Sequence, residues 1–334
     1  MADMVSDLLQ RAAVKLNEHQ NWTIVCHENP DGDTLGCGLA LYSLGVRLGK
    51  NARVIGRDPL PPRYAFLAGS DRYEAVNAFP ADAIDSLVIS VDSSTVQRSV
   101  PGFAEALAGC ADSVSIDHHG DNAVSARLSI VDAGASATAE IVADLFEAGG
   151  WEFTKDEAIA LYTALSTDNG NFRFASTSPR SHICAAKLLE AGAEPGYVDD
   201  CVNENLSGPV LGLWGLALSR TELLRGGRAA LFWLSKEDLS AAGADASSVD
   251  GLVNMLLRIR GVKAAAFLCE IFGGNKVSVR TRRPYSARVF ASKFGGGGHI
   301  QAAGARIPGT FDEALNTLRT ELDRYAADGH SSDQ

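Results

Sequence analysis

The stretch "SVSIDHHGDN", Ser113 to Asn122, decides how the rest of this chain is interpreted. The short apolar and β-branched run at 113–116 predicts a strand, and Asp117, His118 and His119 follow it directly. The chain contains only seven histidines, so two side by side next to a carboxylate call for an explanation. A tight turn or a pH-sensitive surface patch would be one. A metal site is another explanation, in which one histidine binds the ion through one ring nitrogen and the N–H of its other ring nitrogen donates to Asp117.

Polar residues that follow apolar strands recur along the N-terminal half. Short apolar runs with little alternation lie at 22–26, 52–56, 86–91 and 113–116, and helical patterns lie between and after them at 34–50, 101–110, 135–149 and 155–167. This order predicts an α/β fold with a parallel, doubly wound sheet covered by helices on both faces. His27, Asp92 and Asp117 each follow a strand directly. Such sheets bind ligands outside the carboxyl ends of their strands, so we expect these side chains at one site.

A second cluster precedes the first long helical pattern, in the motif "HENPDGD" (27–33). His27, Asp31 and Asp33 give the spacing H-x3-D-x-D, and Gly32 predicts a compact turn. Carboxylates this close together are hard to keep ionised without a cation. The simpler interpretation is an ordinary loop in which Asp33 caps the helix. The motif alone does not decide between the two.

Two more acids complete a candidate ligand set. Asp92 stands alone after a strand, and Asp168 lies where a helical pattern ends, a position unfavourable for an acid unless a positive charge is near. Taken singly, each has the simpler interpretation of a helix-cap or turn residue. Together the candidate ligands are His27, Asp31, Asp33, Asp92, His118 and Asp168. This oxygen-rich set favours manganese or magnesium over zinc. It is large enough for two divalent ions that clamp the oxygens of a phosphoryl displacement.

The C-terminal half predicts a smaller α/β domain with a mixed sheet. A strand at 228–235, a helix at 249–261, a strand pair at 263–283 and the run "GGGGH" (295–299) precede a last strand and helix. At 334 residues the chain suits two domains of about 150 residues each. We therefore expect a metal-binding catalytic domain at 1–185, a helical connector at 186–224 and a substrate-binding domain at 225–334, with a cleft between the two domains.

Composition limits the partners. The 30 basic and 41 acidic residues give a net charge of −11, which argues against a broad grip on long duplex nucleic acid. A small anionic ligand can still bind where arginines or metal ions reverse the sign locally. Six scattered cysteines without a CxxC pair suit reduced thiols. The sequence predicts neither a signal peptide nor a membrane span, so we expect a soluble, cytoplasmic protein without a membrane partner.

The motifs, taken in order, resemble a known family. "HENPDGD", "VD" (91–92), "DHH" (117–119), "STDNGNF" (166–172) and "GGGGHIQAAG" (295–304) resemble the DHH phosphoesterase superfamily over nearly the whole chain. The last motif resembles the branch with the DHH-associated C-terminal domain, which includes nanoRNases and 3′-phosphoadenosine 5′-phosphate (pAp) phosphatases of the NrnA type. Cys37, where serine is common, and Asn169, where threonine is usual, depart from the pattern. Neither is a proposed ligand.

The resemblance implies a role for each site residue. One metal ion would be held by His27 and Asp31, the other by Asp33, His118 and Asp168, and Asp92 would bridge both. Asp117 would orient His118, His119 would contact the scissile phosphate, and a water activated by the two metals would attack. The nucleotide would be held by Arg280, Arg282, Gly296, Gly297, Gly298 and His299. Glycines allow backbone N–H groups to approach an anion closely.

The leading hypothesis is a metal-dependent phosphoesterase with two divalent ions, Mn²⁺ ahead of Mg²⁺. Its expected substrates are oligoribonucleotides of a few residues, pApA and cyclic di-AMP, cut to nucleoside 5′-monophosphates, and pAp, cut to AMP. A RecJ-type single-strand exonuclease is the alternative with the same chemistry, disfavoured by the acidic charge and the short chain. From a different class, a catalytically silent nucleotide sensor would require a missing ligand, and none is missing. The resemblance also suggests a homodimer.

Overall fold

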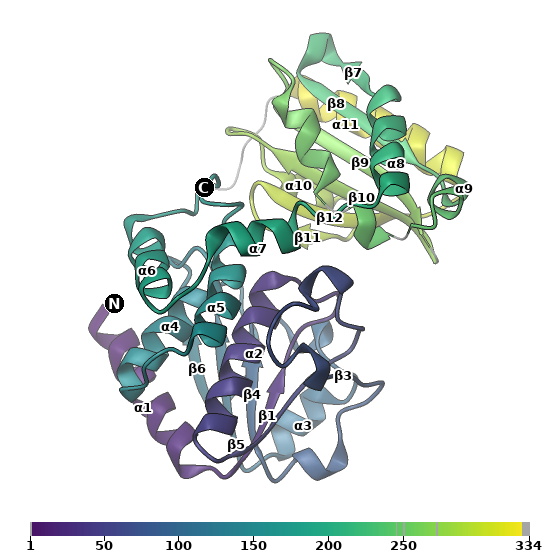
Figure 1. Ribbon diagram of the computed structural model, residues 1–334. Coiled ribbons are helices and arrows are strands. Elements are labelled where there is room, and N and C mark those ends of the chain that lie inside the picture. The colour runs from purple at the N-terminus through teal and green to yellow at the C-terminus, as the bar shows by residue number, and fades with distance from the viewer. Residues whose placement is uncertain (1, 245, 250, 272, 329–334) are drawn as a thin grey trace. The chain divides into compact units, whose positions relative to one another are not determined.

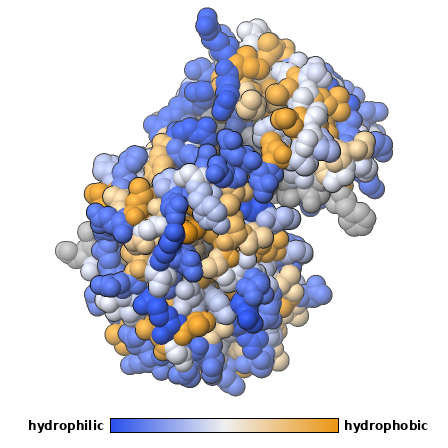
Figure 2. Space-filling model, viewed as in Figure 1, coloured by the Kyte–Doolittle hydropathy of each residue, from blue (hydrophilic) through white to orange (hydrophobic). Residues whose placement is uncertain are grey.

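The computed structural model describes residues 2–244, 246–249, 251–271 and 273–328. The chain divides into two compact units, Met1–Asn205 and Leu206–Gln334, each built around its own six-stranded sheet (Figure 1). The segment at 186–224 is thus divided between the two units. Among the described residues, no helix has the length and hydrophobicity that a membrane span requires. The surface in view in Figure 2 mixes hydrophilic and hydrophobic residues over both units.

The first unit contains a fully parallel sheet. Its strands are β1 (Asn21–Val25), β2 (Asn51–Gly56), β3 (Tyr73–Ala75), β4 (Leu87–Val91), β5 (Asp112–Asp117) and β6 (Leu128–Val131). They lie in the order β3-β2-β1-β4-β5-β6, and every neighbouring pair is parallel. The doubly wound parallel sheet predicted from the sequence is therefore confirmed. The strand order reverses between β1 and β4, and open α/β sheets bind ligands at such a switch point.

Helices cover both faces of this sheet. They are α1 (Ala2–Glu18), α2 (Gly32–Arg47), α3 (Phe103–Gly109), α4 (Thr138–Gly149), α5 (Lys155–Asp168), α6 (Pro179–Glu190) and α7 (Pro195–Val202), with 3₁₀ turns η1 (Pro62–Tyr64), η2 (Ser70–Arg72), η3 (Ala81–Ala83) and η4 (Val96–Arg98). Successive strand residues face opposite sides. Ile24 and Ile89 therefore pack into a core shared with α1, α2, α4 and α5, whereas Val25 and Val88 pack against α3.

Two glycines let α2 and α5 pack closely side by side (Figure 1). A Cβ atom at Gly32 would lie 2.2 Å from Thr167 Oγ1, and one at Gly36 would lie 2.2 Å from the carbonyl oxygen of Ala160. Gly32 is the first residue of α2, so the helix contact requires it, and not the turn that the sequence suggested. The contact brings the first turn of α2 against the last turn of α5.

The second unit contains the mixed sheet expected from the sequence. Its strands are β7 (Glu222–Leu224), β8 (Ala229–Leu234), β9 (Ala264–Ile271), β10 (Gly274–Thr281), β11 (Gly297–Gly298) and β12 (Ala302–Ile307). The order is β11-β12-β10-β9-β8-β7, with β8 and β9 parallel and the other pairs antiparallel. The mixed sheet is therefore confirmed.

Helices also cover this second sheet. They are α8 (Gly208–Ser219), α9 (Lys236–Ala241), α10 (Ala287–Ser292) and α11 (Phe311–Asp328), with 3₁₀ turns η5 (Arg225–Gly227), η6 (Ala246–Val249) and η7 (Leu252–Arg258). One face packs on α10 and α11, and the other on α8, α9 and η7. The α-helix predicted at 249–261 is instead the 3₁₀ segment η7. It lies between Gly251 and Gly261, whose φ angles of 82° and 94° interrupt a helix at both ends.

Candidate metal-binding active site

The motif "HENPDGD" forms the start of α2. Asp31 is the N-cap residue, and its Oδ1 accepts hydrogen bonds from the amides of Asp33 at 3.1 Å and Thr34 at 3.2 Å. The same oxygen lies 3.5 Å from Nε2 of His27. Asp31, and not Asp33, therefore caps this helix, because the side chain two or three residues before an amide is the one that reaches it.

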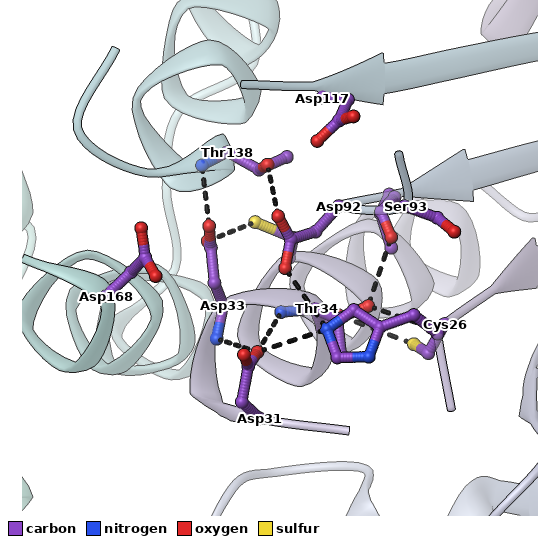
Figure 3. A network of polar contacts seen from close by, with 12 residues as sticks. Cys26, Asp31, Asp33, Thr34, Asp92, Ser93, Asp117, Thr138 and Asp168 are labelled. Carbon is purple, nitrogen blue, oxygen red and sulfur yellow. Dashed lines mark hydrogen bonds and ion pairs between the residues drawn. The ribbon is translucent and has the colours of Figure 1, made fainter. Parts of the chain in front are cut away.

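Asp33 caps a different helix (Figure 3). Its Oδ2 accepts a hydrogen bond from the amide of Thr138 at 2.7 Å, and its Oδ1 accepts one from the amide of Ala139 at 3.1 Å. The N-cap residue of α4 itself, Ala137, has no side-chain oxygen to offer these amides. Cys37 Sγ also donates to Oδ1, at 3.4 Å. Two amides of α4 and the thiol of Cys37 on α2 thus hold the Asp33 carboxylate.

Asp92 follows β4 in a left-handed conformation, with φ 55°. This conformation is uncommon for residues other than glycine, although aspartate adopts it more often than most. Its Oδ1 accepts a hydrogen bond from Thr138 Oγ1 at 3.0 Å, and its Oδ2 lies 3.4 Å from Nε2 of His27. Asp92 is 2% exposed. It therefore links His27 to the start of α4. Figure 3 shows Asp33 and Asp92 meeting at Thr138 there.

His118 lies among three carboxylates. Its Nε2 is 3.4 Å from Asp168 Oδ2, 3.6 Å from Asp92 Oδ1 and 4.0 Å from Asp33 Oδ2. Its Nδ1 is 3.3 Å from the carbonyl oxygen of Ala135. A backbone carbonyl at this distance can accept a hydrogen bond from Nδ1–H, which holds the ring with Nε2 toward the carboxylates.

Asp117 contacts His119 and not His118, so the role implied by the resemblance was wrong. Its Oδ1 lies 2.7 Å from His119 Nδ1 and accepts the His119 amide at 3.2 Å, while Oδ2 accepts from Asn122 Nδ2 at 2.6 Å. The reason is local. In extended backbone, residues two apart share a side and adjacent residues point to opposite sides. Asp117 therefore orients His119, and a carbonyl takes its expected place at His118.

The charges at the site oppose one another. Burial alone would lower the pKa of His27, but the charges of Asp31 and Asp92 outweigh it and raise the pKa to about 10. Burial and the charge of Asp92 raise the pKa of Asp33 well above its usual range. Burial raises the pKa of Asp168 to about 7, against the opposing charge of a nearby histidine. Carboxyl groups this crowded retain protons unless a cation balances them. The donor set therefore fits bound cations.

The donor atoms gather in small groups in which all members lie within 4.8 Å of one another. Three of these groups are His27 with Asp31 and Asp92, Asp33 with His118 and Asp168, and Asp92 with Asp117 and His119. The first group joins His27 and Asp31 to Asp92. The second joins Asp33, His118 and Asp168 but lacks Asp92, which the resemblance implies as a bridge to both ions. Carboxylate oxygens outnumber imidazole nitrogens in both, a composition that suits manganese or magnesium.

Sequence reasoning missed Thr138, which contacts both Asp33 and Asp92. The available signal was its place at the start of a helical pattern, where hydroxyl residues are common. That signal predicts a cap for the helix itself. It does not predict contact with a carboxylate 105 residues earlier in the chain.

The two expected arginines of the second unit lie at the end of β10 and just beyond it. Arg280 Nη1 donates to the carbonyl of Val279 at 3.0 Å. Arg282 is exposed, and its Nη2 donates to the carbonyl of Leu257 at 2.9 Å. Arg280 pairs with Ala302 of β12, three residues after His299. The sheet therefore brings Arg280 near the glycine run in the chain's fold.

The last two glycines of the run form an edge strand of the second sheet. Gly297 and Gly298 form β11, which pairs with β12. At Gly296 a Cβ atom would lie 2.2 Å from the carbonyl oxygen of Gly304, so the backbones approach more closely than any side chain permits. His299 follows on the surface, and its carbonyl accepts the amide of Ala302 at 3.3 Å.

Comparison with known proteins agrees with these motifs. Residues 21–165 match the N-terminal domain of the DHH family, and residues 232–328 match the DHHA1 domain. The chain is 34% identical over 308 residues to the bifunctional oligoribonuclease and PAP phosphatase NrnA of Thermus thermophilus, covering 90% of each chain. It is 27% identical over 313 residues to the protein of the same name from Bacillus subtilis, covering 89% of this chain and 92% of that one.

A solved structure has the same fold throughout. The crystal structure of an exopolyphosphatase-related protein from Bacteroides fragilis superimposes with a TM-score of 0.89 at 25% identity, covering 96% of this chain and 97% of that one. The motifs, both sheets and the relatives agree: the chain belongs to the DHH phosphoesterase family, with a C-terminal DHHA1 domain.

Proposed function

We propose that this phosphoesterase depends on divalent metal ions and hydrolyses short nucleotides. Its substrates would be oligoribonucleotides of a few residues and pApA, with cyclic di-AMP as a further candidate, cut to nucleoside 5′-monophosphates, and pAp, cut to AMP. The observation that carries the proposal is the group of mostly buried histidines and aspartates at the carboxyl ends of β1, β4 and β5. The two NrnA relatives, named for oligoribonuclease and PAP phosphatase activity, support the substrate class.

The proposal assigns the ligands to two ions. One would be held by His27, Asp31 and Asp92, and the other by Asp33, His118 and Asp168. Asp92 would also belong to the second set, because its Oδ1 lies 3.6 Å from His118 Nε2. Two divalent ions, with Mn²⁺ ahead of Mg²⁺, would activate water and stabilise charge on the phosphoryl group. The protein's own part is to hold the ligands in place, since the amides of α4 fix Asp33 and the Thr138 hydroxyl fixes Asp92.

His119 is our candidate for the phosphate contact. Asp117 Oδ1 contacts both Nδ1 and the amide of His119, and these two contacts set the orientation of the ring. Because Nδ1 is engaged in this way, we assign donation to a phosphate oxygen to Nε2. Asn122 Nδ2 in turn donates a hydrogen bond of 2.6 Å to Asp117 Oδ2. Asp117 is thus a positioning residue for His119.

We assign nucleotide binding in the second unit to Arg280, Arg282, Gly296, Gly297, Gly298 and His299. The ordered backbone of β11 and the positive charge at the end of β10 support this assignment. Local positive charge is needed because the chain as a whole carries −11. The homodimer and the cytoplasmic location remain predictions.

The test is a substrate panel with Mn²⁺, comprising pAp, pApA, cyclic di-AMP, RNA of increasing length and single-stranded DNA. We expect hydrolysis of the short nucleotides, whereas preference for long single strands would favour a RecJ-type exonuclease. Asp92→Ala should abolish hydrolysis while circular dichroism shows an intact fold. Asp112→Ala is the matched control. Asp112 begins β5, at the end of the strand away from the proposed metal ligands, and forms an ion pair with Lys15. Full activity of the Asp92 variant would sink the assignment of Asp92 to both ions.

A further inference from the structure

A cavity of about 290 Å³ lies within the first unit, between the end of α5 and α7. Its lining includes Tyr162 and Thr167 of α5, Phe172 of the following loop and Asp199 of α7. The volume lies near the lower end of the roughly 300–1,000 Å³ range of small-molecule sites, which suits one ring system rather than a dinucleotide. The proposed metal ligands do not line the cavity, but Thr167 directly precedes Asp168 in the chain.

The loop that carries Phe172 has an uncommon backbone. Gly170, Asn171 and Phe172 have φ angles of 62°, 55° and 60°, three consecutive left-handed residues. This conformation is strained for a bulky side chain and persists only where the surroundings hold it. Asn169 supplies that hold, because its Oδ1 accepts the Phe172 amide at 2.8 Å and its carbonyl accepts the Phe174 amide at 3.0 Å. The hydrogen bonds from Asn169 therefore keep the Phe172 ring at the cavity wall.

Aromatic rings surround Phe172. Its ring centroid lies 6.3 Å from that of Tyr162 and 5.0 Å from that of His182, with which it stacks. Nucleobases stack on such rings regardless of their identity, because every base has a π-face. The rings thus offer affinity for a base, and selectivity must come from a polar group.

Asp199 is that polar group. Its Oδ1 accepts hydrogen bonds from Asn203 Nδ2 at 2.6 Å and from Asn171 Nδ2 at 3.3 Å. Both bonds end on the same oxygen, and no described residue donates to Oδ2. Burial raises the pKa of Tyr162, and the charge of Asp199 raises it further, which is consistent with the carboxylate lying close to the phenol. The cavity therefore offers a fixed acceptor beside aromatic rings.

We propose that this cavity binds one nucleobase of the substrate, and that Asp199 Oδ2 selects bases with an exocyclic amino group. An ionised carboxylate only accepts hydrogen bonds. Adenine and cytosine present an amino group to it, whereas hypoxanthine and uracil present a carbonyl oxygen at the same position. The inference rests on the proposed function, since it names the base specificity of the same enzyme.

The test compares kcat/KM for pApA with its inosine counterpart, and for pCpC with pUpU. One hydrogen bond to a charged acceptor predicts a preference for the amino bases of about 10-fold or more. Asp199→Asn keeps an oxygen to accept from Asn171 and Asn203 but replaces Oδ2 with an NH₂ group, which donates. We expect it to abolish or invert the preference. Asp200→Asn removes the same charge from an exposed neighbour on α7 that does not line the cavity, and should keep the preference.

Two further measurements keep the outcomes distinct. Phe172→Leu should raise KM for all four dinucleotides alike, and unchanged KM values would exclude stacking at this ring. If no dinucleotide is hydrolysed, the proposed function fails, and calorimetric titration with AMP and IMP still reports on the cavity. Equal treatment of amino and carbonyl bases by the unmodified protein, or the same preference in the Asp199 and Asp200 variants, would overturn the proposal.

Discussion

Replacing Thr138 with valine removes one hydroxyl where Asp33 and Asp92 meet, and we expect metal binding to weaken without loss of the fold. The amide of residue 138 is retained, so its 2.7 Å bond to Asp33 remains. The 3.0 Å bond from Thr138 Oγ1 to Asp92 Oδ1 is lost. Thr138 is 0% and Asp92 2% exposed, so bulk water cannot take the place of the hydroxyl. The perturbation is therefore confined to one buried donor.

The magnitude follows from that one bond. A buried acceptor that loses its donor costs about 1–3 kcal/mol of stability. Removing a residue that orients a metal ligand typically lowers metal affinity by roughly 10- to 100-fold. Because Asp92 is assigned to both ions, we expect the Mn²⁺ affinity of Thr138→Val to fall by about 10-fold or more. Thr138→Ser keeps the hydroxyl and should restore most of it.

The assay is titration of the metal-free protein with Mn²⁺, followed by calorimetry or by the electron paramagnetic resonance signal of free Mn²⁺. Thr163→Val is the matched control. Thr163 is equally buried, but its hydroxyl donates to the carbonyl of Ile159 at 2.8 Å. Wild-type Mn²⁺ affinity in Thr138→Val would refute the reasoning. Equal weakening in Thr163→Val would also refute it, because the loss would then come from general packing.

Two predictions concern the charges of the site. Burial would lower the pKa of His119, but its hydrogen bond to Asp117 raises the pKa to about 9. Asp117→Asn removes the negative partner and should lower the pKa of His119. An unchanged His119 pKa in an NMR titration of the ring would contradict this. Burial raises the pKa of Asp168 in the folded, metal-free protein from 3.8 to about 7. Ionisation of this group therefore opposes folding as the pH rises through that window. Asp168→Asn should remove this loss of thermal stability between about pH 4 and pH 7, and a melting profile with the wild-type pH dependence would argue against it.

Much of the fold follows from local pattern. Apolar runs of strand length alternate with helical patterns, and this alternation alone predicts a parallel sheet. The positions of His27 and Asp92 follow from the same pattern, because a residue directly after a parallel strand lies at the ligand-binding edge. The segment at 249–261 shows the limit: its apolar spacing is helical, but left-handed glycines at both ends leave only the 3₁₀ segment η7.

The sequence by itself determined the kinds of groups at the site and the sheet edge where they lie, since strand ends and residue types are local properties. Only the tertiary structure decided which groups touch. Asp33 caps α4 through an amide 105 residues away, and Thr138 joins it to Asp92, because the packing of α2, α4 and α5 sets those distances. The partner of Asp117 depends on which way its neighbours point as the strand ends. Side-chain direction and the approach of distant helices are absent from residue spacing, and they decide the chemistry of this site.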